Sequence, residues 1–444
     1  MSKYRTEPFK IWNKAKELRM DVYRDYAQAH EKGGLRIGGG AWSFMPIAAG
    51  LGDDVYWLSS EPYSASVAHD IPFSKRAMAA TENQGFARDL CGYIRNYWGS
   101  IILNEYVFGG PWPKADLLFE DHICCSHAKW YQRVREIEDP DIPYFCIDCT
   151  TGPYLISPDA EPLQKHKLEY LVNQLLDTID QIDKLAQKKW NRKFDDEKFI
   201  EALNHDCNAT SLWCDICCLN KNIPARMDEK SMFAFFNLAG NNRFRKSVTD
   251  FYKELYDEIQ YRVDNQIAAV GNERIRIFGD SPPPWAFLNV YRYLETYGCV
   301  AVGSAYNIGI FGVWQWDENG VYRGRTTPEQ AGIVMKTRED AVRVMADWYL
   351  SKAMWQHLYG PEPKIKIMLT IADQWKCDGA LIHQNRGCEM STLHSPEIRL
   401  ALMDKGIKVA TYEGNMGDFR EFDIQSTKNR IDIFLESLGA KKIP

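Results

Sequence analysis

The chain has 444 residues, more than a single hydrophobic core normally needs, and its 45% hydrophobic content suffices for two buried cores. The net charge is −6 and no lysine- or arginine-rich run is present, which argues against a nucleic-acid or membrane-surface partner. The first twenty residues lack the apolar core of a secretory signal. The nearly uncharged stretch 296–315 contains four glycines, which favours a buried strand and loop over a membrane span. We therefore expect a cytoplasmic protein.

The twelve cysteines are expected to be reduced in that compartment. Disulfides are then disfavoured, and each cysteine is either a buried core residue or a ligand to a metal or cluster. Most must be core residues, so the task is to find the few that are placed differently.

The first strand signal leads into the glycine-rich stretch from Gly38 to Pro46, after a polar helix expected over residues 8–32. Such a loop allows close approach of a ligand to the backbone, although a simple tight turn is equally compatible with it. The spacing is not that of a dinucleotide fingerprint. A second short strand, 55–58, is followed by Glu61, which is either a site carboxylate or a solvated turn residue.

A helix is predicted from Thr81 to Gly99. Thr81 and Gln84 match a capping box, apolar residues follow at helical spacing, and Gly99 is placed to end the helix. Cys91 falls beside the apolar face of this helix. At that position a core role and a ligand role are both open.

A buried strand at 116–119 is followed at once by Cys124 and Cys125. Adjacent side chains point in different directions, so at most one of these two thiols is expected to face a site. His127 lies two residues beyond Cys125.

The remaining cysteines of the first 270 residues are expected to be structural. Cys146 and Cys149 lie on a predicted strand, where a pair does not converge as it does in a zinc-binding turn. An amphipathic helix from Leu168 opens a helical segment that continues to about residue 265. Four cysteines of that segment are predicted to be core residues: Cys207, Cys214, Cys217 and Cys218.

A second α/β unit begins with a strand at 274–278, a helix that extends to about residue 296 and a strand at 299–302. The strand that starts at Gly379 is followed by a polar loop that places Cys388 just past its carboxyl end. In open parallel sheets, ligands bind at that edge. A thiol at this position is predicted to be a ligand or a nucleophile.

The sequence thus predicts an α/β protein with two doubly wound, parallel-sheet (Rossmann-like) units that face a cleft, and a helical segment between them. The predicted boundaries are 1–160, 161–270 and 271–444. If the two units face each other, Cys91, Cys125 and Cys388 can converge. Three thiolates and one open corner can hold a [4Fe–4S] cluster that binds a further ligand, whereas isolated buried cysteines are the alternative.

Several stretches, in this order along nearly the whole chain, resemble the benzoyl-CoA reductase / 2-hydroxyacyl-CoA dehydratase family. The resemblance implies that Cys91, Cys125 and Cys388 hold a [4Fe–4S] cluster. Ser126 stands where the family pattern usually has Asp, and the extra Cys124 leaves open which of the two adjacent thiols is the ligand. The matching stretches are Leu90–Arg95, Cys125-x-x-x-Lys129, Ile277–Ser281, Asp378-Gly379 with Cys388, and Leu402 with Gly406-Ile407.

Within the family, the chain most resembles the cluster-bearing subunit of ATP-dependent, class I benzoyl-CoA reductases. This likeness implies reduction of benzoyl-CoA, or a related aromatic acyl-CoA, to a cyclohexadienoyl-CoA. Electrons would come from ferredoxin through separate ATP-hydrolysing electron-activating subunits, beside a paralogous cluster subunit. The sequence itself has no P-loop motif, so we expect ATP to act on a partner.

Protonation of the reduced ring requires an acid. His127 is the candidate nearest in sequence to a predicted ligand, followed by Glu61; a structural histidine is the alternative. Two other functions are left open. A dehydratase would use the same cluster to remove water from a 2-hydroxyacyl-CoA, and a non-catalytic electron-transfer subunit would carry a fully ligated cluster.

Overall fold

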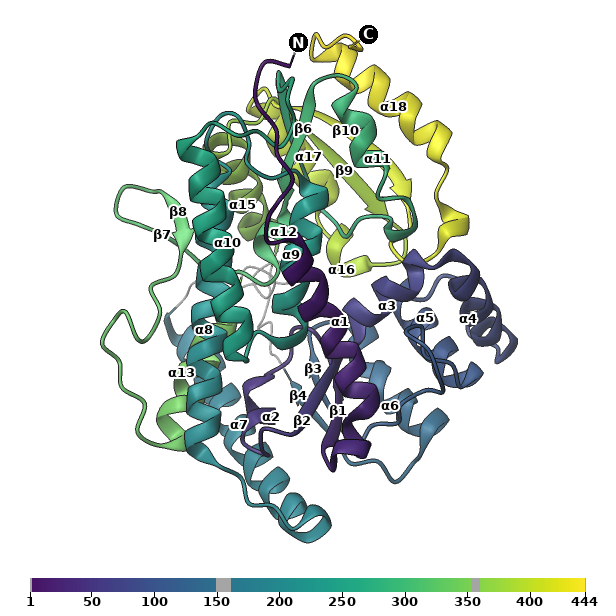
Figure 1. The fold of residues 1–444 in the computed structure, drawn as a ribbon, viewed down its shortest axis with the longest axis vertical. Helices are drawn as coiled ribbons and strands as arrows, with labels where there is room; N and C mark the ends of the chain where they lie inside the picture. Colours follow the sequence, from purple (N-terminus) through teal and green to yellow (C-terminus); the bar gives the residue numbers. More distant parts are fainter. Residues whose placement is uncertain (1, 149–160, 353–359, 444) are drawn as a thin grey trace.

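The computed structural model describes residues 2–148, 161–352 and 360–443, and its two parallel sheets lie in opposite halves of the molecule (Figure 1). Both sheets have four strands, and within each sheet every neighbouring pair is parallel. The strands are β1 Leu35–Gly39, β2 Val55–Ser59, β3 Leu117–His122 and β4 Tyr144–Asp148 in the first sheet, and β5 Ile275–Gly279, β6 Cys299–Ser304, β9 Gly379–Asn385 and β10 Lys408–Gly414 in the second. The predicted α/β fold with two doubly wound parallel units is confirmed.

The strand orders place one topological switch point in each sheet. The first sheet has the order β2-β1-β3-β4, so the chain leaves β1 on one side and returns to β3 on the other. The second has the order β10-β9-β5-β6, which puts the corresponding switch between β5 and β9. Crevices at the carboxyl ends of such strand pairs are where open α/β sheets bind ligands.

Helices cover the sheets and fill the space beside them (Figure 1). The helices of the first half are α1 Trp12–Gln28, η1 Ala29–Lys32, α2 Pro46–Ala49, α3 Ser60–His69, α4 Ile71–Asn83, α5 Gly92–Leu103, α6 Cys125–Glu138, α7 Glu161–Trp190 and α8 Asp196–Leu219. Those of the second half are α9 Glu229–Asn242, α10 Lys246–Asp264, η2 Trp285–Phe287, α11 Val290–Glu295, α12 Ala305–Gly309, α13 Arg338–Leu350, α15 Pro361–Gln374, α16 Glu389–Thr392, α17 Ser395–Asp404, η3 Phe419–Glu421 and α18 Ile424–Ser437. Strands β7 Trp314–Trp316 and β8 Tyr322–Gly324 form an antiparallel hairpin.

The helix predicted from Thr81 to Gly99 is wrong in its bounds. Thr81 lies near the end of α4, which begins after Asp70, where the Asp70 carboxylate accepts the backbone N–H of Phe73. A turn with Gly85 in the left-handed region follows, and Gly99 lies inside α5. The consequence matters for the site, because Cys91 is the N-cap of α5 and does not lie on the side of a helix.

The helical segment between the sheets packs across the predicted domain boundaries. Val342 and Ala346 of α13 belong to the same hydrophobic cluster as Leu175 of α7 and Leu203 of α8. The division at residues 160 and 270 therefore stays a prediction. Three of the four cysteines of α8 are buried and Cys218 is partly buried, as predicted for core residues.

Two further expectations concern the C-x-x-C pair and a membrane span. Cys149, the second cysteine of the C-x-x-C pair, lies outside them, while Cys146 is exposed. None of the described helices is both long enough and apolar enough to cross a membrane.

Candidate active site

Four cysteines line one cavity of about 160 Å³ between the two units. Cys91, Cys124 and Cys125 come from the first unit, and Cys388 comes from the second. The cavity lies beyond the carboxyl ends of β3 and β9, beside the switch point of each sheet. The predicted cleft is therefore present, and the structure brings all three predicted thiols to it.

Each thiol lies at the start of a helix. Cys91 is the N-cap of α5, Cys124 is the N-cap of α6 with Cys125 as its first residue, and Cys388 is the N-cap of α16. The unpaired backbone N–H groups of a first turn stabilise negative charge on sulfur. The backbone N–H groups of the following turns lower the thiol pKa values of Cys91, Cys124 and Cys388, although burial outweighs them.

The adjacent cysteines differ in their surroundings. Burial raises the pKa of Cys91 to about 12, and the nearby Cys388 and Cys124 add to the rise. Burial likewise raises the pKa of Cys124 to about 11, with contributions from Cys388 and Cys125. Cys125 is exposed, and its sulfur lies 4.0 Å from Oε2 of Glu389. Cys91, Cys124 and Cys388 are thus the partly buried thiols of the cavity, and the prediction for Cys125 stays a prediction.

The loop that carries Cys388 is held by a buried ion pair. Nζ of Lys364 lies 3.1 Å from Oδ2 of Asp280 and donates to the carbonyl oxygens of Ser391 and Leu393, at 2.7 and 3.2 Å. Both charged side chains are at most 2% exposed. This arrangement joins α15, the end of β5 and the turn after Cys388.

Two glycines beside the thiols pack against Asn415. A Cβ atom on Gly92, next to Cys91, would lie 2.5 Å from Oδ1 of Asn415, and one on Gly387, next to Cys388, would collide with the same side chain. Oδ1 of Asn415 accepts the backbone N–H groups of Gly417 and Asp418. Gly92 and Gly387 precede Asn415 by 323 and 28 residues, so one turn brings the two thiol-bearing segments together.

His127 and Glu61, the two predicted acid groups, form a buried pair. Nε2 of His127 lies 2.7 Å from Oε1 of Glu61, and Nδ1 lies 2.9 Å from Oε1 of Glu120. The other Glu61 oxygen accepts the backbone N–H of Ala41 and the hydroxyl of Ser60, each at 2.8 Å. Glu61 is thus fixed by the glycine-rich loop and by α3, and it is not a solvated turn residue.

The charges of this group follow from its burial and pairing. Burial alone would raise the pKa of Glu61, but the charge and hydrogen bond of His127 lower it below the ordinary value. Burial opposes protonation of His127, yet the Glu120 and Glu61 carboxylates raise its pKa well above the ordinary value. Burial raises the pKa of Glu120 to about 8, against the pull of His127. The raised pKa of His127 and the lowered pKa of Glu61 favour an imidazolium beside an ionised carboxylate.

Donor atoms of Glu120, Asp121 and His127 lie within 4.8 Å of one another. Hydrogen bonding explains this grouping, because Asp121 accepts the hydroxyl of Ser43 at 2.7 Å and Glu120 pairs with His127. A Cβ on Gly40 would lie 2.8 Å from Oε1 of Glu120. The glycine-rich loop therefore makes room for this buried acid group.

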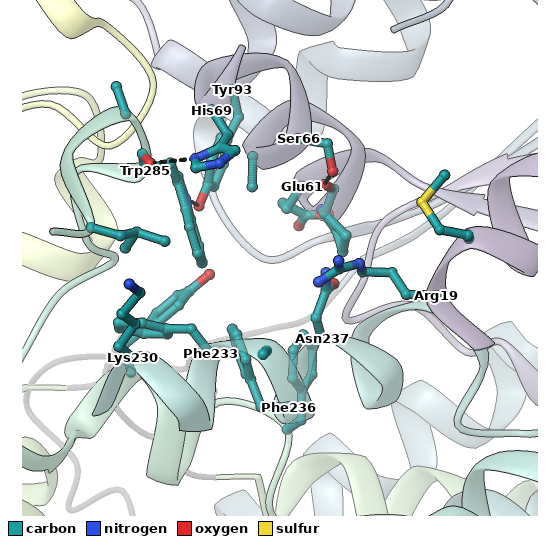
Figure 2. A pocket seen from close by; sticks show the side chains of 18 of the residues that line it. Arg19, Glu61, Ser66, His69, Tyr93, Lys230, Phe233, Phe236, Asn237 and Trp285 are labelled. Atoms are coloured by element: carbon teal, nitrogen blue, oxygen red, sulfur yellow. Dashed lines mark hydrogen bonds between the residues drawn. The ribbon is translucent and has the colours of Figure 1, made fainter. Parts of the chain in front are cut away.

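A larger cavity of about 580 Å³ adjoins the thiol cavity (Figure 2). The two cavities share Trp42, Glu61, Tyr93 and Tyr306 among their lining residues. Among the residues that the structure describes, Glu61 is the one carboxylate that lines both. Glu61 therefore lies between the larger cavity and the thiol cavity.

Sequence reasoning missed several residues of the site. Cys124 was not missed, because the doubled thiol had left it open as an alternative to Cys125, but Glu120 followed a buried strand without any motif. Lys364 and Asn415 act from elements distant in sequence, so no local pattern marks them. Tyr93 lies two residues after Cys91, which could have drawn attention to it, but no motif in the sequence gives the tyrosine a role.

Comparison with known proteins places the chain in a family. A sequence profile described as "2-hydroxyglutaryl-CoA dehydratase, D-component" matches residues 71–438. The (R)-2-hydroxyisocaproyl-CoA dehydratase alpha subunit of Clostridioides difficile is 24% identical over 96% of this chain and 95% of its own length. The (R)-phenyllactyl-CoA dehydratase alpha subunit of Clostridium sporogenes is 24% identical over 81% of this chain and 80% of its own. The lactoyl-CoA dehydratase subunit alpha of Anaerotignum propionicum is 21% identical over 82% of each chain.

These relatives are dehydratase subunits, so the comparisons support the dehydratase alternative better than the benzoyl-CoA reductase that the sequence motifs favoured. The wider family prediction is confirmed. The chain belongs to the 2-hydroxyglutaryl-CoA dehydratase, D-component family.

Proposed function

We propose that this chain is the cluster-bearing subunit of a 2-hydroxyacyl-CoA dehydratase, which converts a 2-hydroxyacyl thioester to the 2-enoyl thioester and water. The observation that carries the proposal is the convergence of thiols from both units on one cavity that shares lining residues with a larger one. The dehydratase relatives support the reaction class.

The thiols fit a [4Fe–4S] cluster with three protein ligands. We assign Cys91, Cys124 and Cys388 as the ligands, because these three thiols of the cavity are partly buried, whereas Cys125 is exposed. When bound, such a cluster supplies one-electron chemistry and an iron that is open to the substrate. The chain's part is to hold the thiols at helix starts and to limit solvent around them.

Glu61 and His127 are proposed to handle the protons. Dehydration takes a proton from C3 and a hydroxyl group from C2, so a base and an acid must both reach the substrate. Glu61 lines both cavities and shares a hydrogen bond of 2.7 Å with His127. In this proposal Glu61 accepts the C3 proton and returns it to the departing C2 hydroxyl group, which leaves as water. His127 holds the Glu61 carboxylate in place and stabilises its charge.

The proposal includes partners. The relatives are named as alpha subunits, which supports a second, paralogous cluster subunit. ATP-hydrolysing electron-activating subunits, with ferredoxin as the electron source, are proposed because the sequence has no P-loop of its own. The free thiols of the described cysteines are compatible with a reducing compartment, and a cytoplasmic location belongs to the proposal.

A second candidate is the reduction of benzoyl-CoA or a related aromatic acyl-CoA. The aromatic lining of the larger cavity favours it, because such walls accept a planar ring. A non-catalytic electron-transfer subunit is less well supported, because the thiols adjoin a cavity of about 580 Å³.

Electron counting separates the two enzymes. The chain is purified without oxygen together with its co-purifying subunits, then supplied with ATP, reductant and either (R)-phenyllactyl-CoA or benzoyl-CoA. We expect cinnamoyl-CoA to form with far less than one electron consumed per product. Consumption of two electrons per product, with turnover of benzoyl-CoA alone, would overturn the dehydratase proposal in favour of the reductase.

Replacement of Glu61 tests its proposed role as the base. Glu61→Gln should keep its iron but lower kcat by about 100-fold or more, since a positioned base contributes on that order. Glu389→Gln is the matched control, because Glu389 lines the thiol cavity but not the larger cavity. Equal activity of Glu61→Gln and the unaltered chain would remove Glu61 from the mechanism.

A further inference from the structure

We propose that the 580 Å³ cavity binds the acyl-CoA and selects a bulky apolar acyl group, with an aryl ring as the best fit, over a short aliphatic one. The inference rests on the proposed function and specifies its substrate class. Cavities of several hundred Å³ that are mainly apolar, with a few converging polar groups, are typical small-molecule sites.

The walls of the cavity are aromatic and held in place. Phe233 packs edge-to-face on Trp285 with ring centroids 5.4 Å apart, and Phe236 does the same with Tyr306 at 5.5 Å. The indole N–H of Trp285 donates to the hydroxyl of Tyr93 at 2.6 Å, which occupies its polar atom. The space between these rings therefore offers mainly apolar surface, suited to an aryl or branched alkyl group.

Two cationic side chains line the cavity. Arg19 and Lys230 lie on opposite sides of it (Figure 2), and neither has an ion-pair partner among the residues that the structure describes. Of the described lining residues, Glu61 alone carries a carboxylate, and it lies where the two cavities meet. Two lining cations without an ion-pair partner in the described residues suit the phosphate groups of CoA.

The arrangement gives the thioester one orientation. Phosphates at Arg19 and Lys230 leave the acyl group pointing inward, past the aromatic walls and toward Glu61 and the thiols. A short acyl group would reach the same junction but leave the ring-lined space without a ligand. The preference for a bulky group thus follows from the apolar surface that only such a group covers.

A matched pair of thioesters tests this. Propionyl-CoA and 3-phenylpropionyl-CoA differ by one phenyl ring, and neither has the 2-hydroxyl group needed for dehydration. We expect isothermal titration of the full chain to give about 10- to 100-fold tighter binding of 3-phenylpropionyl-CoA, from burial of the ring. Equal affinities would overturn the inference.

Two variants locate the ring and the phosphates. Ala234→Phe places a ring in the cavity, so it should weaken 3-phenylpropionyl-CoA at least 10-fold and leave propionyl-CoA nearly unchanged. Lys230→Gln should weaken both thioesters by a similar factor. Thermal unfolding checks that each variant is folded. Unchanged binding of 3-phenylpropionyl-CoA to a folded Ala234→Phe variant would also overturn the inference.

The outcomes separate this inference from the function on which it rests. A chain that holds iron and dehydrates a 2-hydroxyacyl-CoA, yet binds the two probes equally, contradicts the acyl selectivity alone. A chain that prefers 3-phenylpropionyl-CoA but holds no iron supports the selectivity and contradicts the cluster-based function.

Discussion

Lys364 illustrates how a single side chain far from the thiols in sequence supports the site. Its ammonium group pairs with Asp280 and binds the two carbonyl groups that follow Cys388. Breaking a buried ion pair by removing one partner leaves an uncompensated charge. The loop after β9 would then lose its two hydrogen bonds from Lys364, and the nearby Asp280 would lose its counter-charge.

We therefore predict that Lys364→Met lowers the free energy of unfolding by about 3 kcal/mol and reduces the iron content of the chain. Denaturant unfolding and iron analysis measure the two effects. Lys366→Met is the control, because Lys366 is exposed on the same helix and its side chain contacts the ring of Trp316; it should keep its iron and lose at most about 1 kcal/mol of stability. A Lys364→Met variant with full stability and full iron would show that the pair does not support the site.

Glu229, at the start of α9, gives a prediction on pH. The side chain is 2% exposed, and burial raises its pKa to about 8. An unfolded glutamate titrates near about 4.3, so from there to about pH 8 the folded chain holds a proton that the unfolded chain has lost. Stability is therefore lost as pH rises through this window, by at most about 1.4 kcal/mol per pH unit.

Glu229→Gln should remove that part of the pH dependence. Relative to the unaltered chain, the variant's free energy of unfolding should rise between pH 5 and pH 8, since the glutamine has no proton to lose. Urea unfolding at pH 5, 6.5 and 8 measures the difference. A difference that stays constant over this range would mean that Glu229 titrates normally in the folded chain.

At the scale of elements, the thiol-bearing turns depend on close backbone packing. Gly92 begins α5 and Gly387 precedes α16, and both face Asn415 in the turn after β10. A side chain at either position must displace this turn. Replacement by alanine therefore acts on two thiols at once, although it changes neither.

Gly92→Ala is accordingly expected to lower iron content substantially, because its Cβ would lie 2.5 Å from Oδ1 of Asn415 and 3.0 Å from Cα of Gly417. Iron analysis of the purified chain is the measurement. In the control Gly271→Ala, the new Cβ meets the side chain of Ser2, near the start of the chain, at 3.1 Å. Retention of full iron in Gly92→Ala would argue against the tight packing described here.

The strands could be predicted from short apolar runs followed by glycine or polar residues, and the positions of β1, β3, β5 and β9 agree with that reasoning. The helix around Cys91 could not be predicted, because Thr81 and Gln84 match a capping pattern, whereas the cap is Asp70, eleven residues before Thr81. Gly85, in the left-handed conformation, lies in the turn that follows α4, and a single glycine in the sequence does not predict that a helix ends there.

For the whole molecule, the site exists because two switch points face each other. The sequence could place thiols at the ends of β3 and β9, but not their distance across the cleft. It also could not decide between Cys124 and Cys125, since that depends on which way the first turn of α6 faces. The cavity beside the thiols involves α1, α3, α9 and η2, and no motif connects these elements in advance.

The central claim is that Cys91, Cys124 and Cys388 together hold one cluster. Iron and sulfide analysis of the oxygen-free chain, with each of these cysteines and Cys125 replaced in turn by serine, tests it most directly. We predict about four irons per unaltered chain, clear loss in Cys91→Ser, Cys124→Ser and Cys388→Ser, and retention in Cys125→Ser. An iron-free unaltered chain, or loss in Cys125→Ser with retention in Cys124→Ser, would contradict the account.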